Sequence, residues 1–286
     1  MEYDDAPIGI FDSGFGGLTV AREIIKALPE ESIIFYGDRA NCPYGPRNPK
    51  QVREFVLRIC QWLIDRNVKM IVIACNTATA AGLEAAQQAF DIPIIGVIEP
   101  GARAAARATH NRRVGVIATK GTVESGVYTK AIRNIDAGIT VFSTATPRFV
   151  EIAELGIRMA KGPIENYTSL ASKVFIRPAF QEIAQDYLEP LRRSEIDTLV
   201  LGCTHFPLLK TLIGGVVGSH VKLISSAKEV SIDCKDLLTR REALAHVGNI
   251  PSYQFASSDP DVEEFASFGE RVLRMPLGEV QFSPLD

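Results

Sequence analysis

Two short segments of the chain follow one pattern, in which an apolar run ends at a cysteine and continues into small hydrogen-bonding residues. They read Ile71-Val72-Ile73-Ala74-Cys75-Asn76-Thr77 and Leu199-Val200-Leu201-Gly202-Cys203-Thr204-His205. Short apolar runs of this kind are typical of buried strands in a parallel sheet. Residues just past the carboxyl end of such a strand line the ligand crevice of an α/β fold. We therefore expect two half-sites facing one small substrate, an outline that suits proton transfer by two bases.

Strand-like runs alternate with helical periods along most of the chain, which predicts an α/β fold with mostly parallel sheets. The expected strands cover residues 7–11, 32–36, 70–74, 94–98, 114–118, 139–143, 198–201 and 221–224. The expected helices cover residues 18–28, 51–65, 78–90, 102–108, 123–135, 149–159, 169–192 and 261–273. The alternation restarts after Glu99-Pro100-Gly101, so Pro100-Gly101 is the expected crossing between two related halves. We assign residues 1–98 plus 214–286 to a first domain and residues 99–213 to a second.

Composition excludes several classes of protein. A formal net charge of −3 gives no basic footprint for nucleic acid. No stretch is long enough to span a membrane, and the N-terminal residues lack the basic region and apolar core of a signal peptide, so a cytoplasmic protein is expected. The 5 cysteines are scattered without metal-ligand spacing or a disulfide framework. We expect reduced thiols, with Cys60 buried in a helical apolar pattern.

The first expected strand ends at Phe11-Asp12-Ser13-Gly14-Phe15-Gly16-Gly17. Glycines after a strand, with Asp38 further on, are also a feature of dinucleotide-binding sites. However, Thr19 stands where a third glycine would pack helix against strand, and Asp12 would place a negative charge beside a pyrophosphate. We favour a tight turn that exposes Asp12 and Ser13, with a helix cap as the alternative.

Pro43-Tyr44-Gly45-Pro46 predicts a rigid loop after the second strand. Proline fixes φ, and glycine lets the backbone approach a ligand closely. A simple surface turn is the alternative.

Both matched cysteines precede expected helices. A thiol has an ordinary pKa of about 8.5, which a helix N-terminus or a nearby proton acceptor lowers. His205 could exchange a proton with Cys203, and Asp12 could do so with Cys75. The polar residues beside the thiols suit a bound carboxylate: Asn76, Thr77 and Thr204.

Two other chemistries use the same residues. Nucleophilic Cys–His catalysis, as in thiol hydrolases, needs one cysteine and leaves the duplication unexplained. Metal binding by Cys203 and His205 lacks a further cluster of His or Cys in the sequence.

Five segments together resemble bacterial glutamate racemase in order and spacing, over most of the chain to about Leu209. They are Phe11-Asp12-Ser13-Gly14-Phe15-Gly16-Gly17-Leu18, Pro43-Tyr44-Gly45, Ala74-Cys75-Asn76-Thr77-Ala78, Gly96-Val97-Ile98-Glu99-Pro100 and Leu201-Gly202-Cys203-Thr204-His205-Phe206-Pro207-Leu208. The resemblance implies a cofactor-independent isomerase, without a metal, that interconverts L- and D-glutamate and supplies D-glutamate for peptidoglycan. It also implies two pseudo-symmetric α/β domains with the active site in the cleft between them, and a homodimer.

The resemblance also implies residue roles. Cys75 takes the α-proton of D-glutamate and Cys203 that of L-glutamate, assisted by three auxiliary groups, Asp12, His205 and Glu154. The family often has proline where Glu151 stands, and its auxiliary glutamate falls on Glu154. Because Glu151 is a carboxylate close to Glu154 in the sequence, it is a second candidate for the auxiliary carboxylate. The substrate-binding positions are Asp12, Ser13, Tyr44, Gly45, Asn76, Thr77, Thr119, Thr122, Thr204 and His205.

Two further functions compete with this one. Aspartate racemases share the two-cysteine pattern but typically carry Cys-Thr-Glu at the second site, where this chain has Cys203-Thr204-His205. A non-catalytic protein that binds acidic amino acids is the other rival. Binding alone needs no acid–base pair, so the presence of both thiols favours the enzyme.

Overall fold

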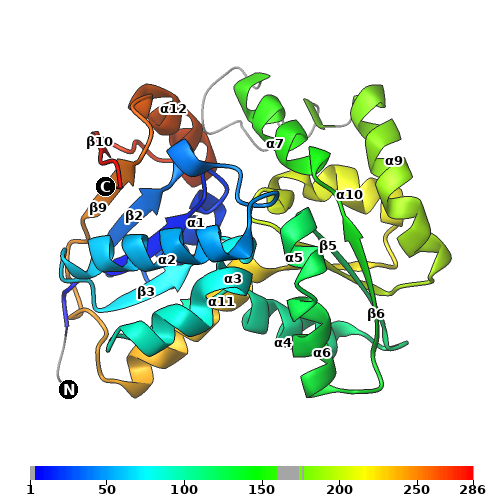
Figure 1. Cartoon of the computed structure of the whole chain (residues 1–286), viewed down its shortest axis with the longest axis horizontal. Helices are drawn as coiled ribbons and strands as arrows, with labels where there is room; N and C mark the ends of the chain where they lie inside the picture. The colour runs from blue at the N-terminus through cyan, green and yellow to red at the C-terminus, as the bar shows by residue number, and fades with distance from the viewer. Residues whose placement is uncertain (1–3, 160–173, 176, 286) are drawn as a thin grey trace. The chain divides into compact units, whose positions relative to one another are not determined.

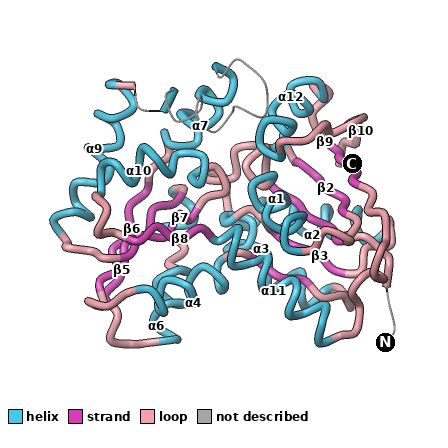
Figure 2. The backbone as a smooth tube through the Cα atoms, turned by 180° about the vertical axis from the view of Figure 1, so that it is seen from behind, coloured by secondary structure: helices cyan, strands magenta, loops and turns pink. Residues whose placement is uncertain are grey.

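A computed structural model of the chain describes residues 4–159, 174–175 and 177–285, and the backbone divides into two compact units (Figure 1). Unit 1 comprises Met1–Val97 and Ala227–Asp286, and unit 2 comprises Ile98–Ser226. Each unit contains a parallel sheet with helices around it (Figure 2). The expected α/β class with parallel sheets is confirmed. The first residues of the helix expected over 169–192 lie outside the described residues.

In the described part of unit 1, six strands form one sheet in the order β10-β9-β2-β1-β3-β4. All of the pairings are parallel. The strands are β1 (Ile8–Asp12), β2 (Ile33–Gly37), β3 (Met70–Ile73), β4 (Ile94–Gly96), β9 (Tyr253–Ser257) and β10 (Val280–Phe282). The helical elements are α1 (Leu18–Ala27), η1 (Arg39–Asn41), α2 (Pro49–Ile64), α3 (Asn76–Ala89), α11 (Ser226–Arg240) and α12 (Val262–Leu273).

Helices cover both faces of this sheet, which explains why β1, β2 and β3 are buried along their whole length. Successive side chains of a strand point to opposite faces. Tyr36 of β2 joins the core formed with α2 and α3. Its neighbour Phe35 faces α12, where the ring of Phe265 lies 6.0 Å away.

The described residues of unit 2 form a four-stranded parallel sheet in the order β6-β5-β7-β8. The strands are β5 (Arg113–Ala118), β6 (Thr140–Ala145), β7 (Thr198–Gly202) and β8 (Lys222–Ser225). The described helical elements are α4 (Ile98–Ala108), α5 (Lys120–Glu124), α6 (Val127–Ile135), α7 (Arg148–Met159), α9 (Pro178–Arg193), η3 (Phe206–Leu209) and α10 (Lys210–Val217). Helices α4 and α6 pack on each other, and α9 packs on α10.

The two sheets repeat one topology. In unit 1 the order β2-β1-β3-β4 matches β6-β5-β7-β8 in unit 2, and β9 and β10 extend the first sheet beyond β2. In such an order the chain reverses its winding direction between the first and third strands. Ligands bind outside the carboxyl ends of the strands at this switch point. The switch points therefore lie at the ends of β1 and β3 in unit 1, and of β5 and β7 in unit 2.

The structure differs from the expected elements at several places, and helices α10 and α11 were not among the expected helices. Helix α4 starts at Ile98 and includes Pro100 and Gly101, because proline is tolerated in the first turn of a helix where no N–H partner is needed. The units meet at Val97/Ile98 and at Ser226/Ala227, so residues 214–226 fall in unit 2, where β8 pairs with β7. Strands β9 and β10 were not among the expected strands.

Candidate active site

Asp12 and Ser13 lie at the switch point of unit 1. Asp12 is the last residue of β1 and is fully buried, and its Oδ2 accepts a hydrogen bond of 3.1 Å from the N–H of Gly14. A Cβ on Gly17, which precedes α1, would collide with the Asp12 side chain. The turn after β1 is tight, as expected, but the expected exposure of Asp12 is wrong, because the turn folds over this carboxylate and buries it. Ser13 beside it is half-buried.

Cys75 follows β3 at the same edge of the sheet and caps the N-terminus of α3. Its Sγ accepts from the N–H of Ala78 at 3.4 Å, and the thiol donates to Ser13 Oγ at 3.6 Å. The partial positive charge of a helix N-terminus favours a thiolate at this position. Cys75 as a whole is buried and retains 6% exposure.

Four further expected substrate-binding positions belong to unit 1. Asn76 and Thr77 form the first turn of α3 and are buried. Tyr44 is also buried, and its hydroxyl donates to Asp38. Burial and the charge of Asp38 raise the pKa of Tyr44, so the phenol remains a donor. Gly45 next to it is half-buried.

In unit 2, Cys203, His205 and Glu154 form a chain of polar contacts. Cys203 Sγ lies 3.8 Å from His205 Nδ1, and His205 Nε2 lies 3.1 Å from Glu154 Oε1. Edge-on packing of Phe149 in α7 against Phe206, with ring centroids 5.5 Å apart, holds the helix of Glu154 on the loop of His205.

His205 is almost completely buried, at 4% exposure. Burial by itself lowers the pKa of His205, but the hydrogen bonds to Cys203 and Glu154 and the charges of these groups raise it to about 10. The imidazole is therefore protonated at neutral pH and stands between two groups that can carry negative charge.

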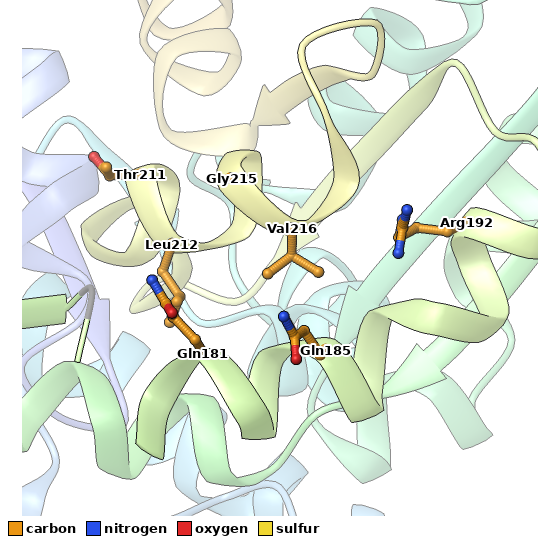
Figure 3. A pocket seen from close by; sticks show the side chains of 7 residues that line it. All are labelled: Gln181, Gln185, Arg192, Thr211, Leu212, Gly215 and Val216. Carbon is orange, nitrogen blue, oxygen red and sulfur yellow. The ribbon is translucent and has the colours of Figure 1, made fainter. Parts of the chain in front are cut away.

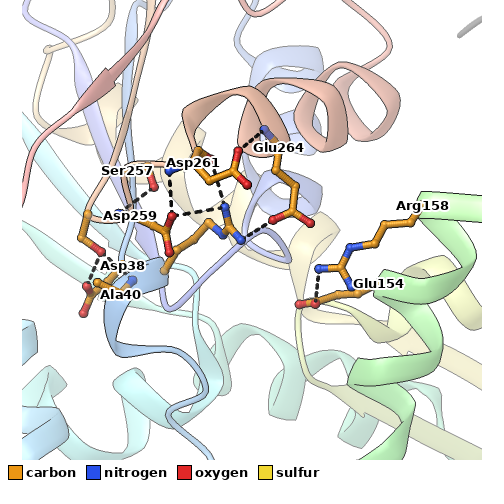
Figure 4. Close-up of polar contacts among 10 residues, drawn as sticks. Asp38, Ala40, Glu154, Arg158, Ser257, Asp259, Asp261 and Glu264 are labelled. Carbon is orange, nitrogen blue, oxygen red and sulfur yellow. Dashed lines mark hydrogen bonds and ion pairs between the residues drawn. The ribbon is translucent and has the colours of Figure 1, made fainter.

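The structure distinguishes the two carboxylates considered for this site. Glu154 contacts His205. It also pairs with Arg158 at 3.4 Å, as Figure 4 shows. Glu151 lies one helical turn earlier and is exposed. Only Glu154 of the two is in hydrogen-bonding distance of the histidine in the described structure.

Thr119 and Thr122 lie at the carboxyl end of β5, the position in unit 2 that corresponds to the end of β1. Thr119 caps α5, with its Oγ1 3.4 Å from the N–H of Thr122 and 3.1 Å from the Thr122 hydroxyl. Thr204 lies buried beside Cys203. Unit 2 thus repeats the arrangement of unit 1, with a thiol after the third strand and hydroxyl groups after the first.

The remaining thiols differ from Cys75 and Cys203. Cys60 is fully buried in the core of unit 1, and burial raises its pKa to about 12. Burial also raises the pKa of Cys234. Among the described residues, no three His, Cys, Asp or Glu side chains are grouped closely enough to hold a metal ion.

A separate pocket lies within unit 2 between α9 and α10, with a volume of about 390 Å³ (Figure 3). It is lined by Gln181, Gln185, Arg192, Thr211, Leu212, Gly215 and Val216. None of the expected site residues lines it. We place a candidate half-site at the switch point of each unit because the titratable groups of that unit gather there.

Two residues near the site have contacts that the sequence pattern did not reveal. Tyr128 of α6 is buried, and a Cβ on Gly202 would come within 3.1 Å of its ring, so the glycine before Cys203 allows α6 to approach β7. Asp38 joins Tyr44 to the C-terminal segment through Ser258. The sequence carried a signal for Asp38 only as part of a glycine-rich pattern, and none for Tyr128.

Comparison with known proteins agrees with this geometry. The sequence matches the Asp/Glu/Hydantoin racemase family over residues 8–230. The chain belongs to this family. It is 44% identical over 273 residues to a glutamate racemase of Geobacter metallireducens, covering 96% of this chain and 94% of that protein.

Solved structures give the same result. The chain is similar to a glutamate racemase isoform of Bacillus anthracis, with a TM-score of 0.86 and 39% identity over 99% of this chain and 98% of the other. It is also similar to a glutamate racemase of Francisella tularensis in complex with D-glutamate, with a TM-score of 0.85 and 33% identity over 99% of each chain.

Proposed function

We propose that this chain is a glutamate racemase that interconverts L- and D-glutamate without a cofactor, by a two-base mechanism that uses Cys75 and Cys203. The observation that carries the proposal is the repeated topology, which gives each unit a cysteine just after the third strand of the same four-strand order. Inversion at a carbon requires a base on one face and an acid on the other. The mechanism therefore requires the two thiols to reach opposite faces of one Cα.

Cys75 removes the α-proton of D-glutamate in this mechanism. The N-terminus of α3 stabilises the thiolate that is needed for this step. Asp12, buried at the end of β1, is the auxiliary group of this half-site. The proton passes from Cα to Cys75 Sγ, and the resulting carbanion receives a proton on its opposite face from the thiol of Cys203.

Cys203 removes the α-proton of L-glutamate in the reverse direction. The protonated His205 offsets the charge of the Cys203 thiolate, and Glu154 holds the other ring nitrogen of His205. After each turnover the thiol and the thiolate have exchanged places. The two cysteines are therefore expected to titrate as a coupled pair.

The substrate carboxylates and amino group need donors and acceptors that do not react. We assign this role to the main chain at Tyr44–Gly45 and to Ser13, Asn76, Thr77, Thr119, Thr122 and Thr204. Hydroxyl and amide groups at strand ends and helix N-termini are suited to binding carboxylates. The repeated arrangement supplies such groups from both units.

We further propose that the enzyme acts in the cytoplasm as a homodimer and supplies D-glutamate for peptidoglycan, and so for cell-wall formation and cell shape. The support is the family membership together with the resemblance of the site segments to bacterial glutamate racemases. None of the described helices is long and apolar enough to cross a membrane. Neither nucleic acid nor membrane enters the proposed reaction.

Proton NMR of L-glutamate with the purified protein in D2O, combined with chiral analysis, tests the proposed activity. Loss of the α-proton signal together with accumulation of D-glutamate, without added cofactor, is the expected result. Exchange and inversion of aspartate but not of glutamate would identify an aspartate racemase. Binding of either amino acid without exchange would identify a binding protein.

A further inference from the structure

Asp38 is a fully buried carboxylate at the carboxyl end of β2, and three side chains donate to it. Asn41 and Tyr44 come from the loop that follows β2. The third donor is the hydroxyl of Ser258, 2.7 Å away, which lies more than 200 positions later in the chain. Asp38 therefore joins the expected substrate-binding loop to the end of β9.

The sheet register fixes Ser258 in this place. Parallel pairing of β2 with β9 sets Gly37 opposite Ser257, so the residues that follow, Asp38 and Ser258, emerge side by side. The N–H of Ser258 donates to the Gly37 carbonyl at 3.1 Å, and its hydroxyl accepts from the N–H of Ala40 at 2.9 Å. The Ser258 hydroxyl has a donor on one side and Asp38 on the other, which leaves it one orientation.

Tyr44 is held at both ends of its side chain. Its ring lies 5.5 Å from the ring of Phe55 in α2, and its hydroxyl donates to Asp38. The Tyr44 side chain is only 1% exposed, so its phenol group lies in the protein interior. What this loop can offer to a substrate is therefore the main chain at Tyr44 and the half-buried Gly45.

We infer that Ser258 is a positioning residue for glutamate binding, which fixes the main chain at Tyr44–Gly45 by orienting Asp38. The inference rests on the proposed function, because it assigns this loop to the glutamate site. Neither Ser258 nor Asp38 is among the groups that transfer the proton. Loss of the Ser258 hydroxyl therefore weakens substrate binding and leaves proton transfer largely intact.

Steady-state kinetics of Ser258→Ala test this inference. We expect KM for both enantiomers to rise about three- to tenfold, since a hydrogen bond to a charged group is lost, while kcat stays within about twofold. Ser258→Thr keeps the hydroxyl and restores KM. Ser258→Cys keeps the volume but donates weakly, so its KM is intermediate, and this variant carries the test if the alanine variant does not fold. Ser231→Ala is the matched control, since Ser231 is a buried serine of α11 that donates to the Lys228 carbonyl.

A double-mutant cycle with Tyr44→Phe separates positioning from general weakening of the fold. If Ser258 acts through the Tyr44 hydroxyl, Ser258→Ala has little further effect on KM once that hydroxyl is absent. An unchanged KM in Ser258→Ala overturns the inference, and so does an equal increase of KM on the wild-type and Tyr44→Phe backgrounds. In either case, racemisation by the wild-type protein leaves the proposed function in place. A wild-type protein that does not racemise glutamate overturns both.

Discussion

The Nε2 atom of His205 lies 3.1 Å from the Oε1 atom of Glu154, which joins the loop after β7 to a helix 51 positions earlier. The other ring nitrogen of the same histidine faces Cys203 Sγ at 3.8 Å. Both nitrogens of a buried imidazole are thus engaged, so its orientation is fixed. The charge state of this histidine is central to the chemistry that we propose for unit 2.

Glu154→Gln tests the part that the carboxylate plays in this chain of contacts. The bond to Glu154 and its charge raise the pKa of His205, so we expect the substitution to lower that pKa. The basic limb of the pH profile of kcat/KM then moves to lower pH, by about one to two units. Glu151→Gln changes an exposed carboxylate of the same helix, and its profile should match the wild type. Equal shifts in both variants would contradict the assignment of Glu154.

The same histidine makes stability depend on pH. Its pKa is about 10 in the folded protein, against an ordinary histidine pKa of 6.5, so its protonation stabilises the fold fully below about pH 6.5. This contribution is lost as pH rises from about 6.5 to about 10. Urea denaturation at several pH values should show that the stability difference between wild type and His205→Asn shrinks over this interval. His220→Asn, which alters an exposed histidine, should show no such trend.

The two-base mechanism predicts matching losses from the two thiols. Cys75→Ser and Cys203→Ser should each lower racemisation by at least about a thousandfold, because a serine hydroxyl is a far weaker acid than a thiol. Calorimetry should show that both variants still bind glutamate. Cys60→Ala, which alters a core thiol, should keep full activity and lose about 1 kcal/mol of stability. An activity that depends on Cys203 but survives Cys75→Ser would indicate a thiol hydrolase.

We expect substitution of glycine by alanine to have opposite effects on stability at Gly17 and at Gly215. Gly17→Ala would drive a Cβ into the side chain of Asp12, so we expect a loss of about 1–3 kcal/mol in stability and a loss of activity. Gly215 lies in α10 with open space around its Cβ position. Gly215→Ala should raise stability by about 0.5–1 kcal/mol and leave activity unchanged. Thermal unfolding and the racemase assay measure both effects.

Local sequence patterns were sufficient for much of the fold. The apolar runs before Cys75 and Cys203 are indeed buried parallel strands, β3 and β7. The expected helix start at Ala102 is too late, because Pro100-Gly101 predicts an interruption, whereas in the structure these residues lie at the start of α4. Strand β9 was missed since the run at Tyr253–Ser257 contains two buried apolar residues only, and its burial comes from pairing with β2.

Contacts between distant segments account for what the sequence left open in the candidate site. Glu151 and Glu154 share one helix, and only the packing of α7 against the loop of His205 distinguishes them. The sequence singles out Asp38 only as part of a nucleotide-binding pattern. Its contact with Ser258 is not visible in the sequence, because Ser258 lies 220 positions away. Neither contact follows from helical or strand periodicity.

Unit 1 is built from two separated stretches of chain, so its first stretch is synthesised before unit 2 and its second stretch after it. All four strands of the unit 2 sheet lie between residues 113 and 225, so they emerge before β9. Until β9 emerges, β2 is an open sheet edge and Asp38 lacks its Ser258 donor. The loop at Tyr44–Gly45 is thus synthesised early and completed late. A nascent chain that stops short of residue 258 carries Cys75 and Cys203 but lacks the Ser258 contact to the proposed binding loop.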